Sequence, residues 1–435
     1  MLVTIYTLGC KVNTYESNVM MEQFQKLGYQ YVKENADVAI INTCSVTNTA
    51  SRKSVKMIHQ AIRKNPNAVI VVCGCMSQVA TEEIKNIEGV HIVLGNWGKS
   101  QIPSFVEAYF RTKQQIVAVK ELEEVPFECM QLENFNRTRA FIKIQDGCEN
   151  FCSYCIIPYA RGHVRSKSKE EIIQEANSLI QHGHHEIVLT GIHTGHYGSD
   201  LKDYHFSDLL YDLLKLDGLE RLRISSIEMN EITDEVIALM KEYPVLVDHM
   251  HIPLQSGCDK ILTLMNRKYQ LKDFEQKLRD IRVVRPEISI TTDVIVGFPT
   301  ETEKDFEETI DTVKRFAFSK IHVFPYSRRK GTVADEMDGQ IDERIKKERT
   351  KRLIAVSEEL ENNYRKQFLG RQVTVIPETY KDGMLIGHTG NYLLVKVPGS
   401  EALLHQTITV QLTEINGIYM MGKLLSPLHE DSCLC

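Results

Sequence analysis

The sequence predicts an α/β protein built in three parts: an N-terminal parallel α/β domain, a central partial (βα)6 barrel and a C-terminal small all-β barrel. At roughly 150 residues per domain, a chain of 435 residues leaves room for about three domains. Apolar strand-like runs alternate with amphipathic helical runs through the first two parts, which favours parallel sheets. The last part holds short strands separated by turn residues. We expect the parts at residues 1–115, 135–367 and 368–430.

Composition excludes several classes of protein. A hydrophobic fraction of 43% and a charged fraction of 25% are typical of globular chains. No apolar run approaches the roughly 18 to 20 residues that span a bilayer, and the first residues lack the pattern of a signal peptide. We therefore expect a cytoplasmic protein with no membrane partner. Because the net charge is −6, any binding of nucleic acid requires a local basic patch.

Eleven cysteines with no export signal argue for metal binding, catalysis or buried filler rather than disulfides. Cys10, Cys44 and Cys75 each follow a different apolar run of the N-terminal part. The carboxyl ends of parallel strands meet at one edge of a sheet, where ligands bind, so these three thiols could share a site. The alternative is three small buried side chains. Cys73 lies inside a strand and is better explained as filler. The predicted strands cover residues 2–10, 36–44, 67–75 and 90–96, with helices at 15–29 and up to residue 64.

The central part repeats the strand and helix pattern six times, as in a shortened relative of the eight-unit barrel. Its predicted strands are residues 140–145, 186–190, 221–225, 247–254, 288–297 and 320–327, and its amphipathic helices include 169–183 and 305–318. A helix at 341–368 mixes charges of both signs and is predicted to be a solvated face. The final strands are predicted at 371–380, 384–390, 392–399, 407–415 and 419–425, a small barrel of a kind that often binds single-stranded nucleic acid. The polar tail at 429–435 is predicted to be mobile.

The strongest local motif is GCENFCSYC, which contains Cys148, Cys152 and Cys155 directly after the first barrel strand. Three thiolates can hold three irons of a [4Fe–4S] cluster and leave the fourth iron open. The amino and carboxylate groups of S-adenosylmethionine could chelate that iron, and reductive cleavage would then give a 5′-deoxyadenosyl radical. A structural zinc site, the main alternative, usually has four ligands, and no fourth partner is adjacent.

Weaker signals follow the other barrel strands, where a cofactor would lie. Glycines there let the backbone approach a ligand closely, and hydroxyl or carboxylate groups suit a ribose or an ammonium group. A plain turn or cap would also explain each one. The predicted cofactor contacts are Gly191, Gly195, Ser225, Ser226, Glu228, Asp293 and Gly297.

Other polar residues are candidates for substrate or metal binding. His249 and His251 alternate along a strand and should face the same way; hydrogen-bonded pocket histidines are favoured over a metal pair. Arg161 and Arg165 belong to the basic stretch RGHVRSKSK beside the cysteines, where an RNA backbone could pass, although a solvated loop would explain it too. Gln255 ends a strand and is a candidate substrate contact.

The motifs TLGCKVNTYES, NTCSVTN, GCMSQ, GCENFCSYCIIPYARG, HIPLQSGCDKILTLMNRKY and DVIVGFPTET resemble those of the radical SAM methylthiotransferases. The resemblance covers nearly the whole chain, and the terminal barrel is similar to the RNA-binding TRAM domain. It implies a radical SAM barrel in the centre and two [4Fe–4S] clusters that carry the catalysis. Cys10, Cys44 and Cys75 would hold an auxiliary cluster, and Cys148, Cys152 and Cys155 the radical SAM cluster. One S-adenosylmethionine would give the radical and another the methyl group.

The string after Cys10 suggests a branch of the family. Members acting on isopentenyl-adenosine in tRNA typically read CQMN there, those acting on a ribosomal-protein aspartate read CPKN, and this chain reads CKVN. It is most similar to the branch that converts N6-threonylcarbamoyladenosine at tRNA position 37 to its 2-methylthio derivative. The implied partners are the tRNA anticodon loop and an external electron donor. The other two substrates, a methyltransferase without sulfur insertion and an RNA-binding protein with structural metal stay open.

Cys73 leaves a second ligand assignment open for the auxiliary cluster. It stands two positions before Cys75, so strand alternation would put both thiols on one face.

Overall fold

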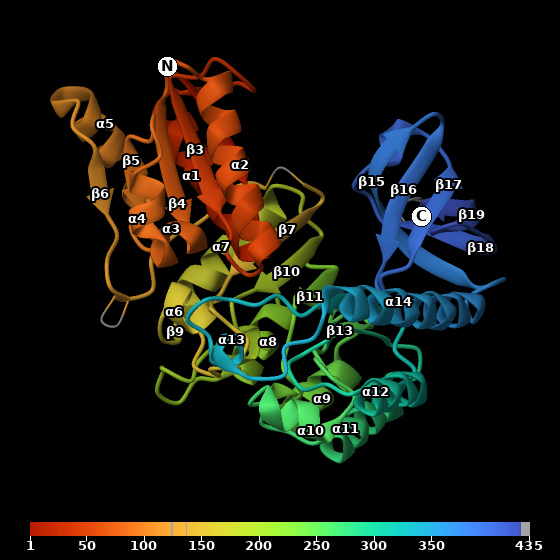
Figure 1. Ribbon diagram of the computed structural model, residues 1–435. Coiled ribbons are helices and arrows are strands. Elements are labelled where there is room, and N and C mark those ends of the chain that lie inside the picture. Colours follow the sequence, from red (N-terminus) through yellow and green to blue (C-terminus); the bar gives the residue numbers. More distant parts are fainter. Residues whose placement is uncertain (123–124, 136, 428–435) are drawn as a thin grey trace, which may run out of the picture.

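The computed structural model describes residues 1–122, 125–135 and 137–427, and the tail predicted to be mobile lies outside them. Figure 1 shows the three parts: an N-terminal sheet with its helices, a central half-open barrel, and a small β-barrel beside helix α14. The predicted fold class is confirmed. None of the helices in the described ranges is long and apolar enough to cross a membrane.

The N-terminal sheet is parallel, with strand order β2-β1-β3-β4-β5-β6 along the described chain. Every residue of β3 and β4 is buried, which explains why these strands read as mainly apolar runs. The short edge strands β2 and β6 were not predicted from the sequence. The strands are β1 (Leu2–Thr7), β2 (Gln30–Tyr31), β3 (Val38–Thr43), β4 (Val69–Gly74), β5 (Ile92–Leu94) and β6 (Ile116–Ala118), and the helices are α1 (Lys11–Lys26), α2 (Asn48–Lys64), α3 (Cys75–Val79), α4 (Thr81–Lys85) and α5 (Ile102–Thr112).

The central part contains two parallel three-stranded sheets, ordered β11-β10-β7 and β12-β13-β14. A bridge between Leu222 and Leu246 joins them, so the six predicted strands follow one another around a partial barrel. One apolar core runs from β1 and α1 into this barrel, which fixes the first two parts against each other.

The six barrel strands are β7 (Arg139–Lys143), β10 (Glu186–Thr190), β11 (Arg221–Ile224), β12 (His249–His251), β13 (Ser289–Val296) and β14 (Lys320–Pro325); a short pair, β8 (Gln145–Asp146) and β9 (Arg165–Ser166), flanks the first. The helices are α6 (Ile157–Arg161), α7 (Lys169–Gln181), α8 (Phe206–Leu214), α9 (Asp234–Glu242), α10 (Asp259–Leu264), α11 (Leu271–Val284), α12 (Glu303–Phe316) and α13 (Val333–Glu336).

Helix α14 (Glu343–Lys366) corrects one prediction, because only its outer side is solvated. Its inner side packs on β14 and α12 and buries Leu353 together with the charged residues Lys346 and Arg349. Arg349 Nη1 donates to a carboxylate oxygen of Glu301 at 2.6 Å, so a buried charge is paired. The mixed charges of this helix therefore did not indicate that one of its faces is packed against the barrel.

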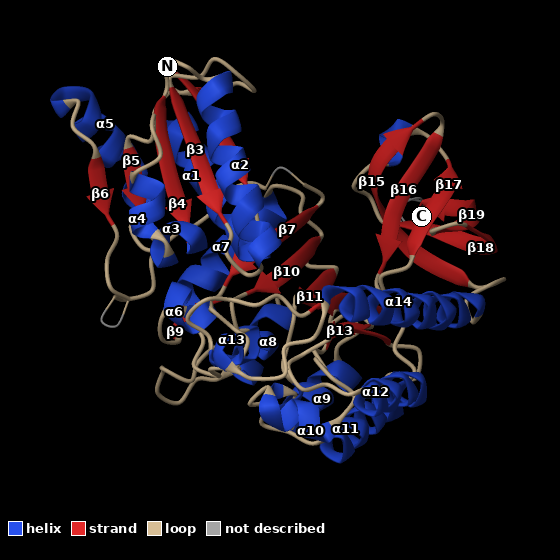
Figure 2. Cartoon of the chain, in the orientation of Figure 1, coloured by secondary structure: helices blue, strands red, loops and turns tan. Residues whose placement is uncertain are grey.

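The terminal part is a closed barrel with strand order β15-β16-β17-β19-β18, as the five predicted strands require. Figure 2 shows it as a separate all-β unit above α14. Two arginines of β11 bind its backbone: Arg221 donates to the carbonyl oxygens of Thr374 and His388, and Arg223 to that of Gly390, each at 3.0 Å. The strands are β15 (Gln372–Lys381), β16 (Met384–Thr389), β17 (Leu394–Pro398), β18 (Ile408–Asn416) and β19 (Tyr419–Pro427).

Candidate active site

The first three predicted cysteines converge at one edge of the N-terminal sheet. Cys10 caps helix α1, Cys44 follows β3, and Cys75 begins α3. Burial, together with smaller contributions from the neighbouring Cys75 and Cys10 thiols, raises the pKa of the Cys44 thiol to about 11. Cys10 faces an open cavity and keeps solvent access, yet the protein around it also raises its pKa, chiefly by burial. The sheet-edge argument for these three residues thus agrees with the geometry.

Gly74 directs Cys75 toward the other two cysteines. Its φ of +100° and ψ of −166° belong to a region that only glycine adopts readily, and a Cβ there would lie 2.6 Å from the Thr43 carbonyl oxygen. The chain therefore leaves the strand at this point. Cys73 remains inside β4, fully buried in the apolar core. The argument from strand alternation does not apply to Cys75, because the strand ends at Gly74 and Cys75 begins a helix.

The second group of cysteines lies in the loop between β8 and α6. The Cys148 amide donates to the Gly162 carbonyl at 3.0 Å, and the Ser153 amide donates to the Met265 carbonyl at 3.1 Å, so the loop is anchored at two points. Burial raises the pKa of the Cys155 thiol to about 12, with further contributions from Cys152 and Cys148. The three thiols therefore lie within electrostatic reach of one another.

Each group of three thiols is accompanied by a buried arginine. Arg161 Nε donates to Cys75 Sγ and Arg267 Nη1 donates to Cys152 Sγ, both at 3.4 Å. Iron–sulfur clusters bind cysteine sulfur as thiolate, so a guanidinium at hydrogen-bond distance suits the negative charge of such a site. Three cysteines with a neighbouring cation thus fit a cluster that the protein holds by three of its irons.

Arg161 does not lie where an RNA contact would need it. It is fully buried, and its guanidinium donates to Glu16 Oε1 at 2.7 Å, to Asp146 Oδ2 at 3.1 Å and to Cys75. Arg165 also turns inward and donates to the Arg161 carbonyl at 2.7 Å. Neither guanidinium is placed to contact an RNA backbone in this structure, because burial turns both toward protein acceptors.

The predicted cofactor residues separate into two groups. Glu228 lines a cavity of about 200 Å³ together with Cys152 and Arg267. The Arg267 guanidinium forms an ion pair with the Glu228 carboxylate. Ser225 and Asp293 line larger cavities on the inner face of the barrel, and Ser226 is partly buried beside Ser225. Their role as cofactor contacts stays a prediction.

The glycines have packing reasons of their own. A Cβ at Gly195 would lie 2.1 Å from a Glu231 oxygen, and one at Gly297 would lie 2.4 Å from Lys346 Cγ. A Cβ at Gly191 would meet the side-chain oxygen of Gln145 at 2.9 Å. Neighbouring protein atoms therefore account for glycine at these three positions. Their predicted role as cofactor contacts stays a prediction.

The backbone of Gln255 forms hydrogen bonds with strand β13. Its φ is +67°, its amide donates to the Asp293 carbonyl at 2.8 Å, and it accepts from the Ile295 amide at the same distance. It bridges the end of the fourth barrel strand to β13. Its function as a substrate contact stays a prediction.

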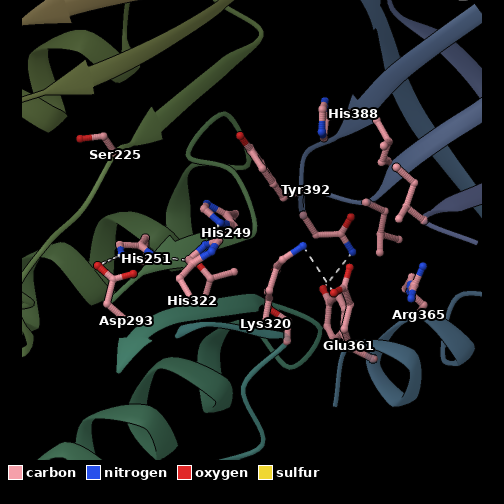
Figure 3. Close-up of a pocket in the computed structure, with 18 of the residues that line it drawn as sticks. Ser225, His249, His251, Asp293, Lys320, His322, Glu361, Arg365, His388 and Tyr392 are labelled. Carbon is pink, nitrogen blue, oxygen red and sulfur yellow. Dashed lines mark hydrogen bonds and ion pairs between the residues drawn. The ribbon is translucent and has the colours of Figure 1, made fainter. Parts of the chain in front are cut away.

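Two adjoining cavities, of about 480 and 280 Å³, are bordered by all three parts of the chain. Both are lined by Lys11, Ser225, His249 and Tyr392, and the smaller one also by Cys10. Figure 3 shows the larger cavity, with His249 on the barrel side and Tyr392 and His388 on the side of the terminal barrel. A path therefore leads from the first group of cysteines to the terminal barrel.

The two predicted histidines face this larger cavity, as strand alternation requires. His251 is not paired with His249 as metal ligands would be. Instead its Nε2 lies 3.3 Å from Asp293 Oδ2, and His322 on β14 completes a group whose ligand atoms all lie within 4.8 Å of one another.

Sequence reasoning missed the cationic and aromatic lining near Cys10. The Tyr392 ring stacks on His249 with centroids 4.7 Å apart, and the guanidinium carbons of Arg223 and Arg139 lie 4.8 and 5.2 Å from its centre. Burial lowers the pKa of Lys11; Tyr392 opposes this shift, whereas Arg139 and Arg223 add to it. Only Lys11 had a signal in the sequence, since it follows Cys10 within the branch-marking string.

Comparisons with known proteins agree with this architecture. Residues 142–313 match the Radical SAM superfamily, and residues 2–95 match Uncharacterized protein family UPF0004. A threonylcarbamoyladenosine tRNA methylthiotransferase MtaB from Bacillus subtilis is 42% identical over 99% of this chain and 97% of its own. Another MtaB, from Aquifex aeolicus, is 38% identical over 92% of this chain and 97% of its own.

More distant relatives share the architecture. A tRNA-2-methylthio-N(6)-dimethylallyladenosine synthase from Thermoanaerobacter is 35% identical over 97% of this chain and 92% of its own. Among solved structures, the radical S-adenosylmethionine methyltransferase TsrM from Kitasatospora setae, with cobalamin and a [4Fe–4S] cluster bound, has a TM-score of 0.58. It is 13% identical, covers 77% of this chain and 76% of its own, and supports the fold alone. With relatives of this identity aligned along nearly its whole length, the chain belongs to the radical SAM methylthiotransferase family, in the group of the MtaB enzymes.

Proposed function

We propose that this chain is a tRNA methylthiotransferase that converts N6-threonylcarbamoyladenosine at tRNA position 37 to its 2-methylthio derivative. The MtaB relatives, similar over almost their full length, support this activity. One structural observation carries it: Cys10, from the first group of cysteines, opens onto a cavity whose other walls come from the barrel and from the terminal β-barrel. A substituted base entering that cavity would reach the sulfur chemistry while the RNA stays outside.

The proposal includes two [4Fe–4S] clusters. Cys10, Cys44 and Cys75 would hold the auxiliary cluster, and Cys148, Cys152 and Cys155 the radical SAM cluster. When bound, the clusters and S-adenosylmethionine supply an electron, a carbon radical, a sulfur atom and a methyl group. Arg161 and Arg267 donate to one thiol in each group and hold its charge in place.

The remaining parts of the chain would bind and orient the RNA. The TRAM-like barrel at 368–430, joined to the barrel of 135–367 through Arg221 and Arg223, would hold the anticodon loop. Bases in a single-stranded loop can be splayed out at modest cost, and an enclosed site limits side reactions with water. An external donor in the cytoplasm would deliver the electrons.

The test is mass spectrometry of nucleosides from tRNA incubated anaerobically with reconstituted protein, a reductant and S-adenosylmethionine. We expect a product heavier by one methylthio group from tRNA bearing threonylcarbamoyl-adenosine. The same mass increase should be absent from tRNA bearing isopentenyl-adenosine. Formation of 5′-deoxyadenosine without any such product would support radical cleavage of S-adenosylmethionine. It would contradict the assignment of threonylcarbamoyl-adenosine as the substrate.

Single cysteine variants separate the two groups. Cys148→Ala should abolish cleavage of S-adenosylmethionine, whereas Cys44→Ala should retain cleavage and lose sulfur transfer. Cys129→Ala, which removes an exposed cysteine outside both groups, is the matched control and should retain both. Sulfur transfer that survives Cys44→Ala would contradict the two-cluster assignment.

A further inference from the structure

We propose that the smaller cavity beside Cys10 binds the free carboxylate of the threonylcarbamoyl group through Lys11 and Arg223. This inference rests on the proposed function and names the groups that select its substrate. The threonylcarbamoyl substituent ends in an α-carboxylate, which is ionised at neutral pH, whereas an isopentenyl group carries no charge. A buried cationic site would therefore favour the threonylcarbamoyl group, whereas an isopentenyl group could form no ion pair there.

The charge of the cavity fits an anion. Its lining includes Lys11, Arg137, Arg139 and Arg223 and, among the residues that the structure describes, no Asp or Glu. Two carboxylates that contact arginines of the lining are already engaged: Glu186 pairs with both Arg221 and Arg223, and Glu378 pairs with Arg139 and lies beside His388. Cations thus outnumber the carboxylates around the cavity.

Arg223 retains hydrogen-bonding capacity in a buried position. Only 2% of its surface is exposed; its Nε donates to Glu186 at 2.7 Å and its Nη1 to the Gly390 carbonyl at 3.0 Å. Its Nη2 is buried and has no hydrogen-bond partner within the described ranges. Buried guanidinium groups are normally satisfied, so Nη2 remains a donor for an acceptor that reaches it from the cavity lined by Arg223.

Lys11 approaches the same cavity from another direction. It begins helix α1 next to Cys10 and lies on the border of both cavities, and along the described chain it forms no ion pair and no side-chain hydrogen bond. A carboxylate between Lys11 and Arg223 would neutralise two cations that line the same cavity. Because Cys10 lines this cavity too, the site would place the substituent, rather than the RNA backbone, beside the first group of cysteines.

The walls match the rest of the substituent. His249 Nδ1 is buried and without a partner among the described residues, and Ser225 offers a hydroxyl on the same border. Both suit the hydroxyl and urea groups of a threonylcarbamoyl chain. Phe141 and Val188 supply apolar surface on the remaining side.

The experiment changes the RNA first, so that it does not depend on a variant that folds. Binding of the reconstituted protein would be measured for two anticodon stem-loops, one bearing threonylcarbamoyl-adenosine and the other its methyl ester. The ester removes the negative charge and adds only one methyl group. We expect the acid to bind at least about 10-fold more tightly, because a charged hydrogen bond to a buried guanidinium is lost. Equal affinities would overturn the inference.

A lysine variant then locates the effect. Lys11→Met should weaken binding of the acid and leave binding of the ester unchanged, whereas Lys11→Arg should retain the preference. Lys347→Met, on the exposed face of α14, is the matched loss of charge and should affect both RNAs alike. If Lys11→Met weakened both RNAs equally, Lys11 would be contacting a backbone phosphate, and the inference would be wrong.

Failure of the inference and failure of the proposed function give different results. If acid and ester RNAs bind equally and the acid RNA still gives the methylthio product, the carboxylate site is wrong and the activity stands. If the acid is preferred through Lys11 but no methylthio product forms, the site stands and the proposed reaction is wrong.

Discussion

Arg161 Nε donates to Cys75 Sγ at 3.4 Å, which joins helix α6, just after the second group of cysteines, to a cysteine of the first. The same guanidinium binds Glu16 of α1 and Asp146 of β8. Lys143 Nζ also contacts both carboxylates, at 2.9 and 2.6 Å. One buried ion network therefore spans the N-terminal domain and the barrel at the point where the two groups of cysteines approach each other.

Removing the guanidinium should destabilise this junction. Arg161→Met leaves Glu16 and Asp146 buried with less compensation, and loss of one partner of a buried pair costs about 3–5 kcal/mol. We expect a fall of that size in the free energy of unfolding of the apoprotein in urea, together with fewer irons bound per chain after reconstitution. Arg344→Met, on a side chain that is 92% exposed, is the control and should change stability by less than about 0.5 kcal/mol. If both variants lost a similarly small amount of unfolding free energy, the ion network would contribute little to stability.

The turn before Cys75 gives a second prediction. Gly74→Ala forces a side chain into a glycine-only conformation and within 2.6 Å of a backbone oxygen that cannot move freely. We expect a loss of about 2 kcal/mol or more and a lower iron content, because the shifted chain would displace the Cys75 thiol.

Gly183→Ala is the matched control for that turn. Gly183 also has a positive φ, +85°, but a Cβ there would meet nothing within 4 Å. Its cost should stay near 1 kcal/mol, with iron content unchanged. Equal effects of the two substitutions would mean that backbone strain alone, and not the contact with Thr43, decides the outcome.

The sequence was sufficient for the features that local patterns encode. The alternation of apolar strands and helices predicted the sheet edge that gathers Cys10, Cys44 and Cys75, and the turn signals predicted the five strands of the terminal barrel. Charge partners were not predictable in this way. The stretch that holds Arg161 and Lys167 reads as basic and solvated, yet both are fully buried and paired with Glu16 and Glu175.

The substrate cavity was the other feature that local patterns missed. Tyr392 lies in a turn of the terminal barrel, with no motif around it, and meets His249 and Arg223 only after the barrel docks. Such residues share a site through tertiary packing, so no spacing in the sequence brings them together.

The buried position of His249 makes the stability of the protein depend on pH. Burial lowers its pKa well below the ordinary value of 6.5, and nearby positive charge lowers it further: Arg223 on β11, His251 on its own strand, Lys11 on α1 and Arg139 on β7. In the unfolded chain the imidazole takes up a proton near pH 6.5, whereas in the folded protein it stays neutral to lower pH. Its contribution to stability is therefore complete above pH 6.5 and declines as the pH falls below that value.

The pH effect can be isolated by comparing variants. Between pH 7.5 and 5.5 in urea, the wild type should lose more unfolding free energy than His249→Gln, by up to about 1.4 kcal/mol per pH unit below 6.5. His59→Gln, which changes an exposed histidine on α2, serves as the control and should follow the wild type. Parallel curves for wild type and His249→Gln would mean that His249 takes up its proton equally in the folded and unfolded chains, in conflict with its buried position between Tyr392 and the arginines.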